Sequence, residues 1–322
     1  MIVRYLEYLA ALARERHFSR AAAACNVTQP TLSAGIKQLE ESLGVLIVER
    51  RHRFAGFTPE GQRVLAWAQR VLADYGGLTQ ELSELREGLE GQIVIGAIPV
   101  SIPTVALLTT PFAAIHSRTR YQVISQTSIE IQQGLDAFSL DVGITYLDNE
   151  PLQRVRSVPL YKERYVLIAH ESSGFAGLPS ISWAKAATLP LCLLTPSMQN
   201  RRIIDAQFLA AGAKANVILE TNSIVTLWSH VRFGPWSTVV PQTFLLLLGD
   251  APGLVRLPLI EPEFFHILGI VASDREPLAP LPRALLEFAQ SLSLSDQIER
   301  EIAKGAWQSF SDRTLLSTER KL

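Results

Sequence analysis

Residues 19–58, SRAAAACNVTQPTLSAGIKQLEESLGVLIVERRHRFAGFT, decide how the first part of the chain folds. Ser19 is a favourable N-cap for a short helix over 20–25, a stretch rich in alanine, which loses little side-chain entropy in a helix. Asn26 follows, and asparagine tolerates the backbone geometry of a tight turn. The stretch therefore opens with a short helix and a turn.

A second helix is expected directly after this turn. Thr28 or Gln29 begins it, and Pro30 stands in its first turn, where a missing N–H costs little. Gly44 suits the position just past its C-terminus. The buried stripe of this helix comprises Leu32, Ile36, Leu39 and Leu43. A helical pattern over 3–15 precedes both, so three helices are predicted, the last two joined by a short turn.

Two helices joined by a short turn form a geometry that reads the major groove of DNA. Polar side chains gather on the second helix, at positions that recur about every four residues. Glutamine can read adenine, serine and threonine are permissive, and lysine contacts phosphate or guanine. The predicted groove-facing residues are Gln29, Thr31, Ser33 and Lys37. A three-helix unit that only packs remains the alternative on patterning alone.

Residues 45–58 are expected to form a two-stranded wing after the second helix. Arg50, Arg51 and Arg53 fall where such a wing would meet DNA phosphates. The charge of the chain is distributed to match. Residues 1–70 hold ten Lys or Arg against six Asp or Glu, whereas residues 74–91 are net acidic. Ordinary surface charge is the alternative explanation.

The sequence from Ser19 to Leu65 resembles the winged helix-turn-helix of LysR-type transcriptional regulators. The family pattern is roughly an alanine-rich helix, then TQPxLSxxIxxLExxLGxxLFxR, then LTPxG. The match has no gap, but Ile47-Val48 replace the usual phenylalanine, and Ala34-Gly35 stand where many members carry larger polar or basic residues. The predicted DNA-binding residues are Ser19, Gln29, Pro30, Thr31, Ser33, Lys37, Arg50, Arg51 and Arg53.

A long helix is expected next, because Thr58-Pro59-Glu60 combines an N-cap, a first-turn proline and a first-turn acid. Its apolar residues follow alternating steps of four and three, which favours a coiled coil or an antiparallel helix pair. Gly76-Gly77 interrupts it, which suits a kink or a close helix crossing, and Gly88 ends it. The seam includes Val64, Ala68, Val71, Tyr75, Leu78, Leu82 and Leu85. The family resemblance implies a dimer on a palindromic operator, assembling to a tetramer.

Beyond Gln92 short apolar strands alternate with helices, which predicts an α/β architecture with largely parallel sheets. Strands are expected at 93–98, 121–126, 142–145, 165–170, 191–194, 217–220, 238–240 and 267–272, and helices at 104–116, 129–139, 201–211, 224–233 and 282–291. The region resembles the periplasmic-binding-protein type 2 effector domain of LysR-type regulators, with a ligand cleft between two lobes.

We therefore divide the chain into a winged helix-turn-helix head, a linker helix, a two-lobed effector domain and a tail. Lobe I takes two separate segments because the chain is expected to return to it from lobe II. The ranges are 1–58 for the head, 59–91 for the linker, 92–303 for the effector domain and 304–322 for the tail, with lobe I at about 93–165 and 267–300 and lobe II at about 166–266.

Polar turns at the ends of the expected strands point to the effector site, because helix N-termini attract anions. Ser101, Thr127 and Ser197 are expected to cap helices, and for each such hydroxyl simple capping is an alternative to ligand binding. Of Arg201 and Arg202, one could pair within the fold and the other attract an anion. The predicted set is Pro99, Val100, Ser101, Thr127, Ser128, Thr145, Thr195, Ser197, Met198, Asn200, Arg201, Asn222 and Trp236. A small carboxylate or other anion fits it better than a cation.

Composition excludes several other classes of protein. The 322 residues include 48% hydrophobic and 19% charged residues, enough for sizeable cores, and no apolar run is long enough to span a membrane. The N-terminus lacks the pattern of a signal peptide, so we expect a cytoplasmic protein. Cys25 and Cys192 are expected to pack rather than to sense redox state, and neither they nor the six histidines have metal-binding spacing.

The leading hypothesis is a ligand-responsive transcriptional regulator without catalysis, metal or cofactor, with RNA polymerase as a further partner. The alternative is an enzyme or a solute-binding protein with a two-lobed fold and an adventitious helical front. An enzyme needs a nucleophile, an acid–base pair or a metal, and the expected cleft offers hydroxyls and amides instead.

Overall fold

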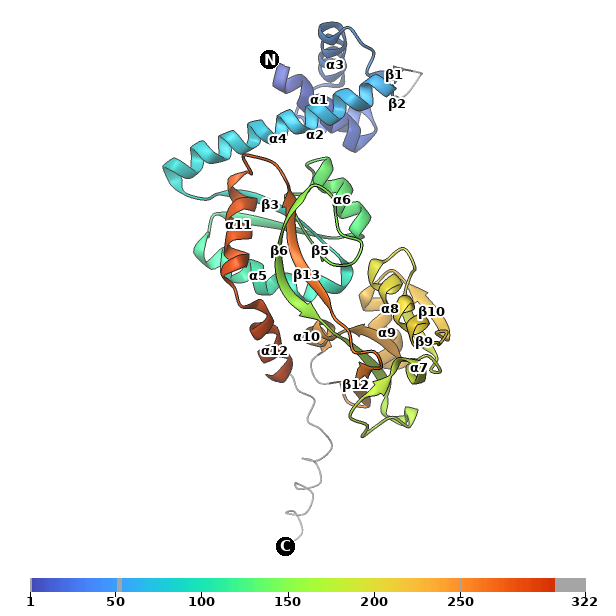
Figure 1. The fold of residues 1–322 in the computed structure, drawn as a ribbon. Coiled ribbons are helices and arrows are strands. Elements are labelled where there is room, and N and C mark those ends of the chain that lie inside the picture. The colour runs from blue at the N-terminus through green and yellow to red at the C-terminus, as the bar shows by residue number, and fades with distance from the viewer. Residues whose placement is uncertain (1, 51–53, 249–250, 305–322) are drawn as a thin grey trace.

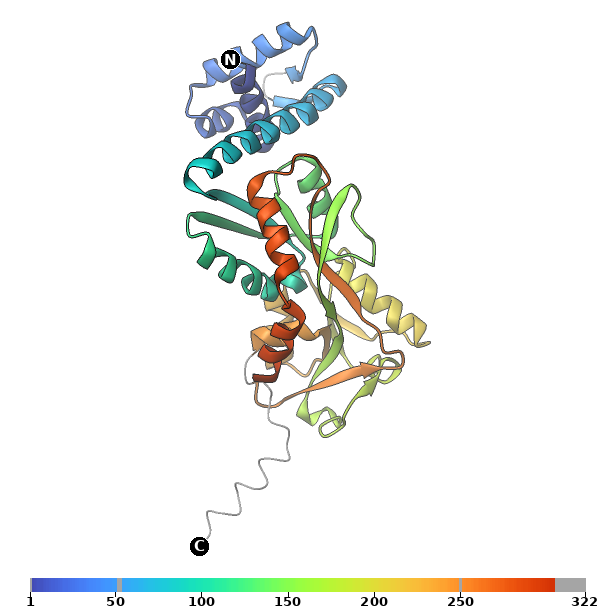
Figure 2. The same cartoon turned by 60° about the vertical axis from the view of Figure 1, so that its left-hand side comes forward.

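The computed structural model describes residues 2–50, 54–248 and 251–304. Figure 1 shows a helical head at one end, the long helix α4 (Pro59–Glu87) beneath it, and a two-lobed domain beyond. The turned view in Figure 2 gives the same order. The chain therefore has the winged helix-turn-helix, linker and two-lobed α/β parts that the sequence predicts.

The head packs three helices and a hairpin around its own hydrophobic core. Leu9 and Leu12 of the first helix, Ile36 of the third and Ile47 before the hairpin are fully buried in it. The two strands of the hairpin pair antiparallel and form the expected wing. The elements are α1 (Ile2–Glu15), α2 (Phe18–Ala24), α3 (Gln29–Leu43), β1 (Val48–Arg50) and β2 (Phe54–Phe57).

The helix ends of the head follow the sequence signals, with one exception. The Thr28 side chain accepts from the Thr31 N–H at the start of α3, and Gly44 ends α3 in the left-handed conformation. The N-cap of α2, however, is His17, whose Nδ1 accepts from the Ser19 N–H. The expected N-cap role of Ser19 was wrong, because α2 begins at Phe18, two residues before its expected start, and His17 already supplies the acceptor for its first turn.

Two residues of α3 hold the head together from inside. A Cβ on Gly35 would lie 2.7 Å from Cδ2 of Tyr8, so only glycine lets α1 approach this closely. Gly35 is buried and does not belong to the outer face of α3. The buried Glu40 carboxylate accepts from the N–H groups of Ile47 and Val48 at 2.9 and 3.1 Å, which ties the wing to α3.

The linker helix α4 begins and ends as the sequence predicts. The Thr58 side chain accepts from the Gly61 N–H, Pro59 fills the first turn, and Gly88 follows the last residue. The helix is continuous through Gly76-Gly77. A Cβ on Gly77 would lie 3.6 Å from Cβ of Ala279, an ordinary van der Waals contact, so the packing of α4 against the two-lobed domain does not require glycine here.

Lobe I is a five-stranded mixed sheet in the order β4-β3-β5-β13-β6. Strand β3 runs parallel to β4 and β5, whereas β13 runs antiparallel to β5 and β6. Helix α11 contacts α4, β6 and β13. The elements are β3 (Gly91–Ala97), η1 (Pro99–Ser101), α5 (Ile102–Ile115), β4 (Thr119–Ser125), α6 (Ser128–Asp136), β5 (Val142–Tyr146), β6 (Val155–Glu163), β13 (His266–Ser273), α11 (Pro280–Ser291) and α12 (Leu294–Lys304).

Lobe II lies farther from the head (Figures 1 and 2) and holds a four-stranded sheet, β11-β7-β12-β8, and the parallel pair β10-β9. Strand β7 is antiparallel to both its neighbours. The elements are β7 (Tyr165–His170), η2 (Glu171–Ser173), β8 (Ile181–Ser182), α7 (Trp183–Ala186), β9 (Leu191–Leu194), α8 (Gln199–Ala210), β10 (Val217–Thr221), α9 (Ile224–Phe233), β11 (Thr238–Pro241), η3 (Gln242–Phe244), α10 (Leu245–Leu248) and β12 (Leu254–Ile260).

The prediction of largely parallel sheets was wrong. The chain leaves lobe I between β6 and β7 and returns between β12 and β13. Strands that arrive directly from the other lobe need no crossover helix, so they can pair antiparallel with their neighbours. Within the described ranges, no helix is both long and apolar enough to cross a membrane.

Candidate functional site

The outer face of α3 exposes most of the side chains that the sequence assigns to DNA reading. Gln29, Pro30, Thr31 and Lys37 are exposed, and Ser33 is half-buried. The face also includes Ala34 and Gln38, both exposed. Its short polar residues and single ammonium group can donate and accept hydrogen bonds at base edges and phosphates.

Hydrogen bonds within the head orient this face before any partner arrives. The Ser19 hydroxyl on α2 donates to Oε1 of Gln29 at 2.8 Å, which leaves the Gln29 amide N–H groups available to an acceptor. The Thr28 and Thr31 hydroxyls lie 2.8 Å apart. Lys37 pairs with Glu41 at 3.5 Å, an exposed pair of little stabilising value that a phosphate could replace.

The wing supplies the second predicted DNA contact. Residue Arg50 ends β1, and β2 begins at Phe54. Arg51 and Arg53 lie outside the described residues, so their part in DNA binding stays a prediction.

The seam on α4 divides into two parts. Val64 and Ala68 pack into the core of the head, and Ala68 is only 1% exposed. The expected dimer contact of Ala68 was therefore wrong, because its own head covers it. Farther along, the large apolar side chains of the seam are exposed, up to 80% for Leu85. These exposed residues are Val71, Tyr75, Leu78, Leu82 and Leu85.

Two ion pairs fasten α4 to lobe I. Arg275, after β13, donates to Asp74 at 3.1 Å, and its guanidinium lies 5.1 Å from the ring centroid of Phe138. Arg283 on α11 lies 3.5 Å from Glu84. The linker helix thus presents one side to its own lobe I and leaves its apolar seam open.

The cleft between the lobes is narrow. Its volume of about 10 Å³ has room for about one water molecule. Six of the predicted effector residues line it: Pro99, Val100, Thr127, Ser128, Met198 and Asn200. Sequence reasoning missed three further lining residues, Ile98, Leu194 and Gln199.

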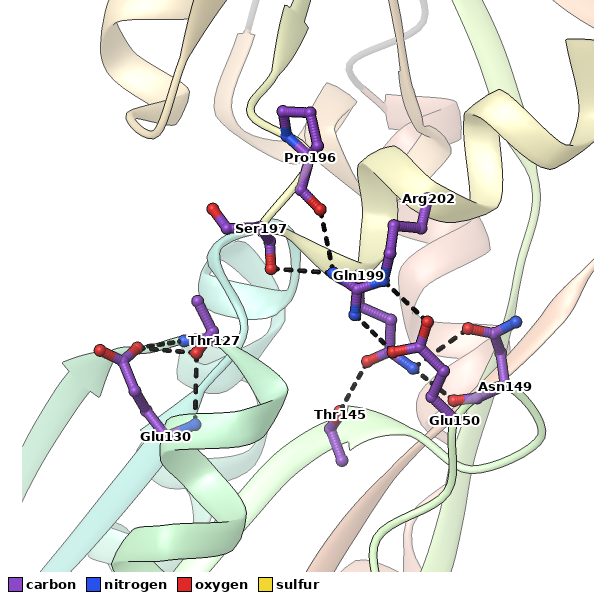
Figure 3. A network of polar contacts seen from close by, with 9 residues as sticks. All are labelled: Thr127, Glu130, Thr145, Asn149, Glu150, Pro196, Ser197, Gln199 and Arg202. Atoms are coloured by element: carbon purple, nitrogen blue, oxygen red, sulfur yellow. Dashed lines mark hydrogen bonds and ion pairs between the residues drawn. The ribbon is translucent and has the colours of Figure 1, made fainter.

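Gln199 crosses the cleft from lobe II to lobe I, as Figure 3 shows. Its Oε1 accepts from the Thr145 hydroxyl at 3.4 Å, and its Nε2 donates to the backbone oxygen of Asn149 and, at 3.2 Å, to the side-chain oxygen of Asn149. The next residue, Asn200, donates to the Tyr146 hydroxyl at 3.2 Å. Thr145 itself is buried and does not line the 10 Å³ space, and its hydroxyl already has Gln199 as a partner.

The two arginines of α8 have different partners. Arg201 is buried and donates to Asp205, Glu220 and the Leu194 carbonyl, all in lobe II, at 2.6–3.0 Å. The prediction that Arg201 faces the effector was wrong, because these acceptors occupy its guanidinium. Arg202 instead reaches lobe I, where it pairs with Glu150. This hydrogen-bonded pair lowers the pKa of the Glu150 carboxyl.

Several hydroxyls of the predicted site serve the fold, as the capping alternative allows. Thr127 caps α6 in a reciprocal capping box with Glu130, the separate pair at the left of Figure 3. Ser101 and Ser197 cap no helix, contrary to expectation. Ser101 is buried and donates to the Ile98 carbonyl, and Ser197 lies 3.0 Å from the Thr195 hydroxyl, because α8 begins only at the next residue but one.

Seven of the thirteen predicted effector residues lie outside the lining of the narrow cleft, and Asn222 and Trp236 are two of them. Asn222 is exposed in the turn before α9. Trp236 is half-buried, with its ring centroid 5.5 Å from that of His230. Neither is among the residues that line the 10 Å³ space, so a contact with an effector would need a wider cleft.

A buried acid marks the crossing between the lobes. Glu163, the last residue of β6, is fully buried and accepts from the Thr243 hydroxyl at 2.6 Å. Burial raises the pKa of its carboxyl to about 8. The neighbouring Tyr161 and Tyr165 are also buried, and burial raises the pKa of both phenols. Sequence reasoning missed this group, because a Glu in a strand pattern gives no local sign of burial.

The two thiols lie in different hydrophobic cores. Cys192 is fully buried in β9, where burial raises its pKa to about 11. Cys25 is half-buried against the core of the head, and burial raises its pKa as well. Among the described residues, no group of His, Cys, Asp and Glu has the geometry of a metal site.

Comparison with protein families divides the chain in the same way as its fold. Residues 3–62 match the family of bacterial regulatory helix-turn-helix proteins of the lysR type. Residues 86–293 match the LysR substrate binding domain. The two matches cover the head with the start of α4, and the two-lobed domain.

Individual relatives agree with both families. The DNA-binding transcriptional dual regulator OxyR of Escherichia coli K12 is 32% identical over 287 residues, 86% of this chain and 91% of that protein. A hydrogen peroxide-inducible genes activator of Haemophilus influenzae is 30% identical over 289 residues, 86% of this chain and 92% of that protein.

Solved structures share the fold over nearly the whole chain. A full-length OxyR from Pseudomonas aeruginosa, solved as a cysteine-to-aspartate variant, has a TM-score of 0.72 at 26% identity and covers 91% of this chain and 99% of its own. CbnR, a LysR family regulator solved in complex with its target DNA, has a TM-score of 0.64 at 20% identity, with 90% and 99% covered. The second likeness concerns the fold alone.

Proposed function

This chain belongs to the LysR family of DNA-binding transcriptional regulators, and we propose that it binds a two-fold symmetric operator as a dimer whose promoter activity an effector controls. Family membership makes it a DNA-binding regulator with an effector domain and not an enzyme. We further propose which residues contact DNA, that the DNA site is two-fold symmetric, and which kind of effector binds. We also place the protein in the cytoplasm, where the DNA is.

The observation that carries the proposal is the exposed face of α3. Gln29, Thr31 and Lys37 project from one short helix, and Ser19 fixes the orientation of the Gln29 amide. In a helix-turn-helix the second helix enters the major groove, so these side chains would reach base edges. Pro30 and Ser33 complete the face, while Arg50, Arg51 and Arg53 of the wing would contact phosphates.

The exposed part of the α4 seam supports the dimer. Val71, Tyr75, Leu78, Leu82 and Leu85 form a stripe of large apolar groups that a single chain leaves in water. Burial of such a stripe against a second copy is favourable by about 25 cal/mol for each Å² removed from water. Two joined heads would then contact two half-sites of a palindromic operator.

We further propose a tetramer built from two dimers, with contacts through the effector domains. Lobe II supports this with exposed large apolar side chains on α8, β10 and α9, among them Leu209, Ile218, Val225 and Phe233, the last 88% exposed. Burial of these side chains against a second copy would remove apolar surface from water. RNA polymerase would be a further partner on the promoter.

The effector proposed for the cleft is a small molecule with a carboxylate or another anionic group. The cleft meets the N-terminus of α8, whose dipole favours negative charge, and hydroxyls of Thr127, Ser128 and Thr145 lie nearby. The small space admits such a ligand only if the lobes move apart, so binding would be coupled to the lobe arrangement.

A thiol switch is a poor alternative for this chain. Several of the relatives carry hydrogen peroxide in their names, and peroxide attacks thiolates rather than thiols. Cys192 is buried with its pKa raised to about 11, and Cys25 packs in a different core. Neither thiol is poised to ionise near neutral pH or to meet the other, so we favour a non-covalent effector.

Fluorescence anisotropy with DNA from just upstream of the protein's own coding region tests the proposal. We expect tighter binding to this fragment than to a scrambled fragment of equal length and composition. A steep fall in affinity with salt should accompany binding to both fragments, because released counterions drive phosphate contacts. Equal affinity for the two fragments would contradict regulation through this stretch of DNA.

A further inference from the structure

The Gln199 side chain lies in the cleft between the lobes, where an effector would bind. Gln199 is the first residue of α8 in lobe II, yet both polar atoms of its side chain bond to lobe I. Oε1 accepts from Thr145 on β5, and Nε2 donates to two oxygens of Asn149 in the following loop. The residue is only 2% exposed, so these bonds form away from bulk water, where leaving them unmade would be costly.

Two further contacts join the same turn of α8 to the same segment of lobe I. Arg202 pairs with both carboxylate oxygens of Glu150, Nε lying 2.8 Å from Oε1, and the carbonyls of Pro196 and Ser197 hold its guanidinium in place. Asn200 donates to the Tyr146 hydroxyl. Figure 3 shows Gln199 and Arg202 side by side, both directed toward the loop with Asn149 and Glu150.

We propose that Gln199 is a built-in ligand of the cleft, whose carboxamide occupies the polar subsite of Thr145 and Asn149 and holds the lobes closed until an effector displaces it. This inference rests on the proposed role of the cleft as the effector site. The remaining space of about 10 Å³ agrees with it, since no small metabolite fits beside the amide.

The subsite also defines the chemistry of the displacing group. The Thr145 hydroxyl donates to an oxygen, whereas the Asn149 backbone carbonyl can only accept. A carboxamide satisfies both with one planar group. A carboxylate would leave the carbonyl facing an oxygen, which is repulsive. An effector that enters here therefore carries a primary amide or amine donor beside an acceptor, in addition to any anionic group held elsewhere in the cleft.

Chemical complementation tests the proposal. Gln199→Ala removes Cγ, Cδ, Oε1 and Nε2, and acetamide has the same four heavy atoms. We expect acetamide to raise the Tm of the full-length Gln199→Ala protein saturably, by about 2–4 °C well above its dissociation constant, and to leave the wild type unchanged. Acetate and N,N-dimethylacetamide, which lack the N–H donor, should not replace it.

The matched control is Gln133→Ala on α6, where glutamine is exposed and its removal opens no cavity. A Tm shift of equal size in Gln133→Ala, the wild type and Gln199→Ala would overturn the proposal. So would the lack of a shift in Gln199→Ala up to molar acetamide.

Should Gln199→Ala fail to fold, Gln199→Glu keeps the volume and puts an oxygen against the Asn149 carbonyl. In a Cys25→Ser background, we would place spin labels at the exposed residues Gln133 in lobe I and Ala210 in lobe II. We expect a longer and broader distance distribution in Gln199→Glu than in the Gln199 parent. An unchanged distribution would overturn the built-in ligand. DNA binding by the wild type is measured in a separate experiment. Loss of the regulator proposal can therefore be told apart from loss of the built-in ligand.

Discussion

The head and the effector cleft use their polar side chains in opposite ways. On α3, Gln29 and Lys37 are exposed, and each has N–H groups that a partner can reach. In the cleft, Gln199 and Asn200 are buried and bond across the two lobes. The head thus presents its contacts before DNA arrives, whereas the cleft satisfies its own groups and must give them up to a ligand. DNA can therefore bind the exposed face of α3 directly, whereas an effector must first displace side chains that already bond across the cleft.

The largest effect is expected from a substitution that separates the two heads of the dimer. Leu82→Asp places a charge in the exposed seam of α4, and we expect the dimer to dissociate into monomers. A single head loses the gain in effective concentration from the second, so operator affinity should fall by about 100-fold or more. Light scattering and anisotropy measure the two effects.

Thr79→Asp is the matched control, because Thr79 is exposed on α4 but does not belong to the apolar seam. It should stay dimeric and bind the operator as the wild type does. A wild-type chain that is already monomeric in light scattering would refute the role of the seam.

A second test separates the two arginines of α8. Arg201→Ala leaves Asp205 and Glu220 without their buried partner, so the free energy of unfolding should fall by about 2 kcal/mol. Arg202→Ala breaks a more exposed pair with Glu150 and should cost less than about 1 kcal/mol. Urea denaturation measures both. Equal losses would mean that both arginines serve the fold alike and that the cleft contact is incidental.

The third test uses the buried acid between the lobes. Between the usual carboxyl pKa of 4.5 and the raised value of about 8, the unfolded chain loses a proton that folded Glu163 keeps. The free energy of unfolding therefore falls as pH rises through this window, by up to about 1.4 kcal/mol per pH unit, and this contribution is constant above it. Glu163→Gln should flatten that part of the profile. Parallel profiles of wild type and variant between pH 5 and 8 would show that Glu163 is ionised in the fold.

The difference between the two regions also explains how much the sequence could predict. In the head the signals are local: Thr28 and Gly44 bound α3 as expected, and the wing follows. Ala68 shows the limit, since a heptad position carries no sign of which partner covers it. The cleft combines turns far apart in the chain, and Gln199 escaped notice because α8 was expected to begin at Arg201 rather than two residues earlier.

Three strands of the two-lobed domain, β6, β8 and β12, were missed, and two of them contain an internal proline. β6 contains Pro159 and β12 contains Pro258, and an internal proline argues against a strand. β6 lies at the edge of its sheet with a register shift near Pro159, where a missing N–H is tolerated. Pro258 falls where β12 changes from pairing with β7 to pairing with β8. Both exceptions depend on neighbours that the sequence does not name.

We infer that the exposed face of α3 reads the operator. The measurement that tests this most directly is the ratio of affinities for upstream and scrambled DNA, compared between the wild type and a Gln29→Ala, Thr31→Ala, Lys37→Ala variant. These side chains are exposed, so the variant should keep its Tm and its dimer. We predict that the ratio falls toward one, since the contacts to base edges are lost while the phosphate contacts of the wing remain. An unchanged ratio in a folded, dimeric variant would contradict the account.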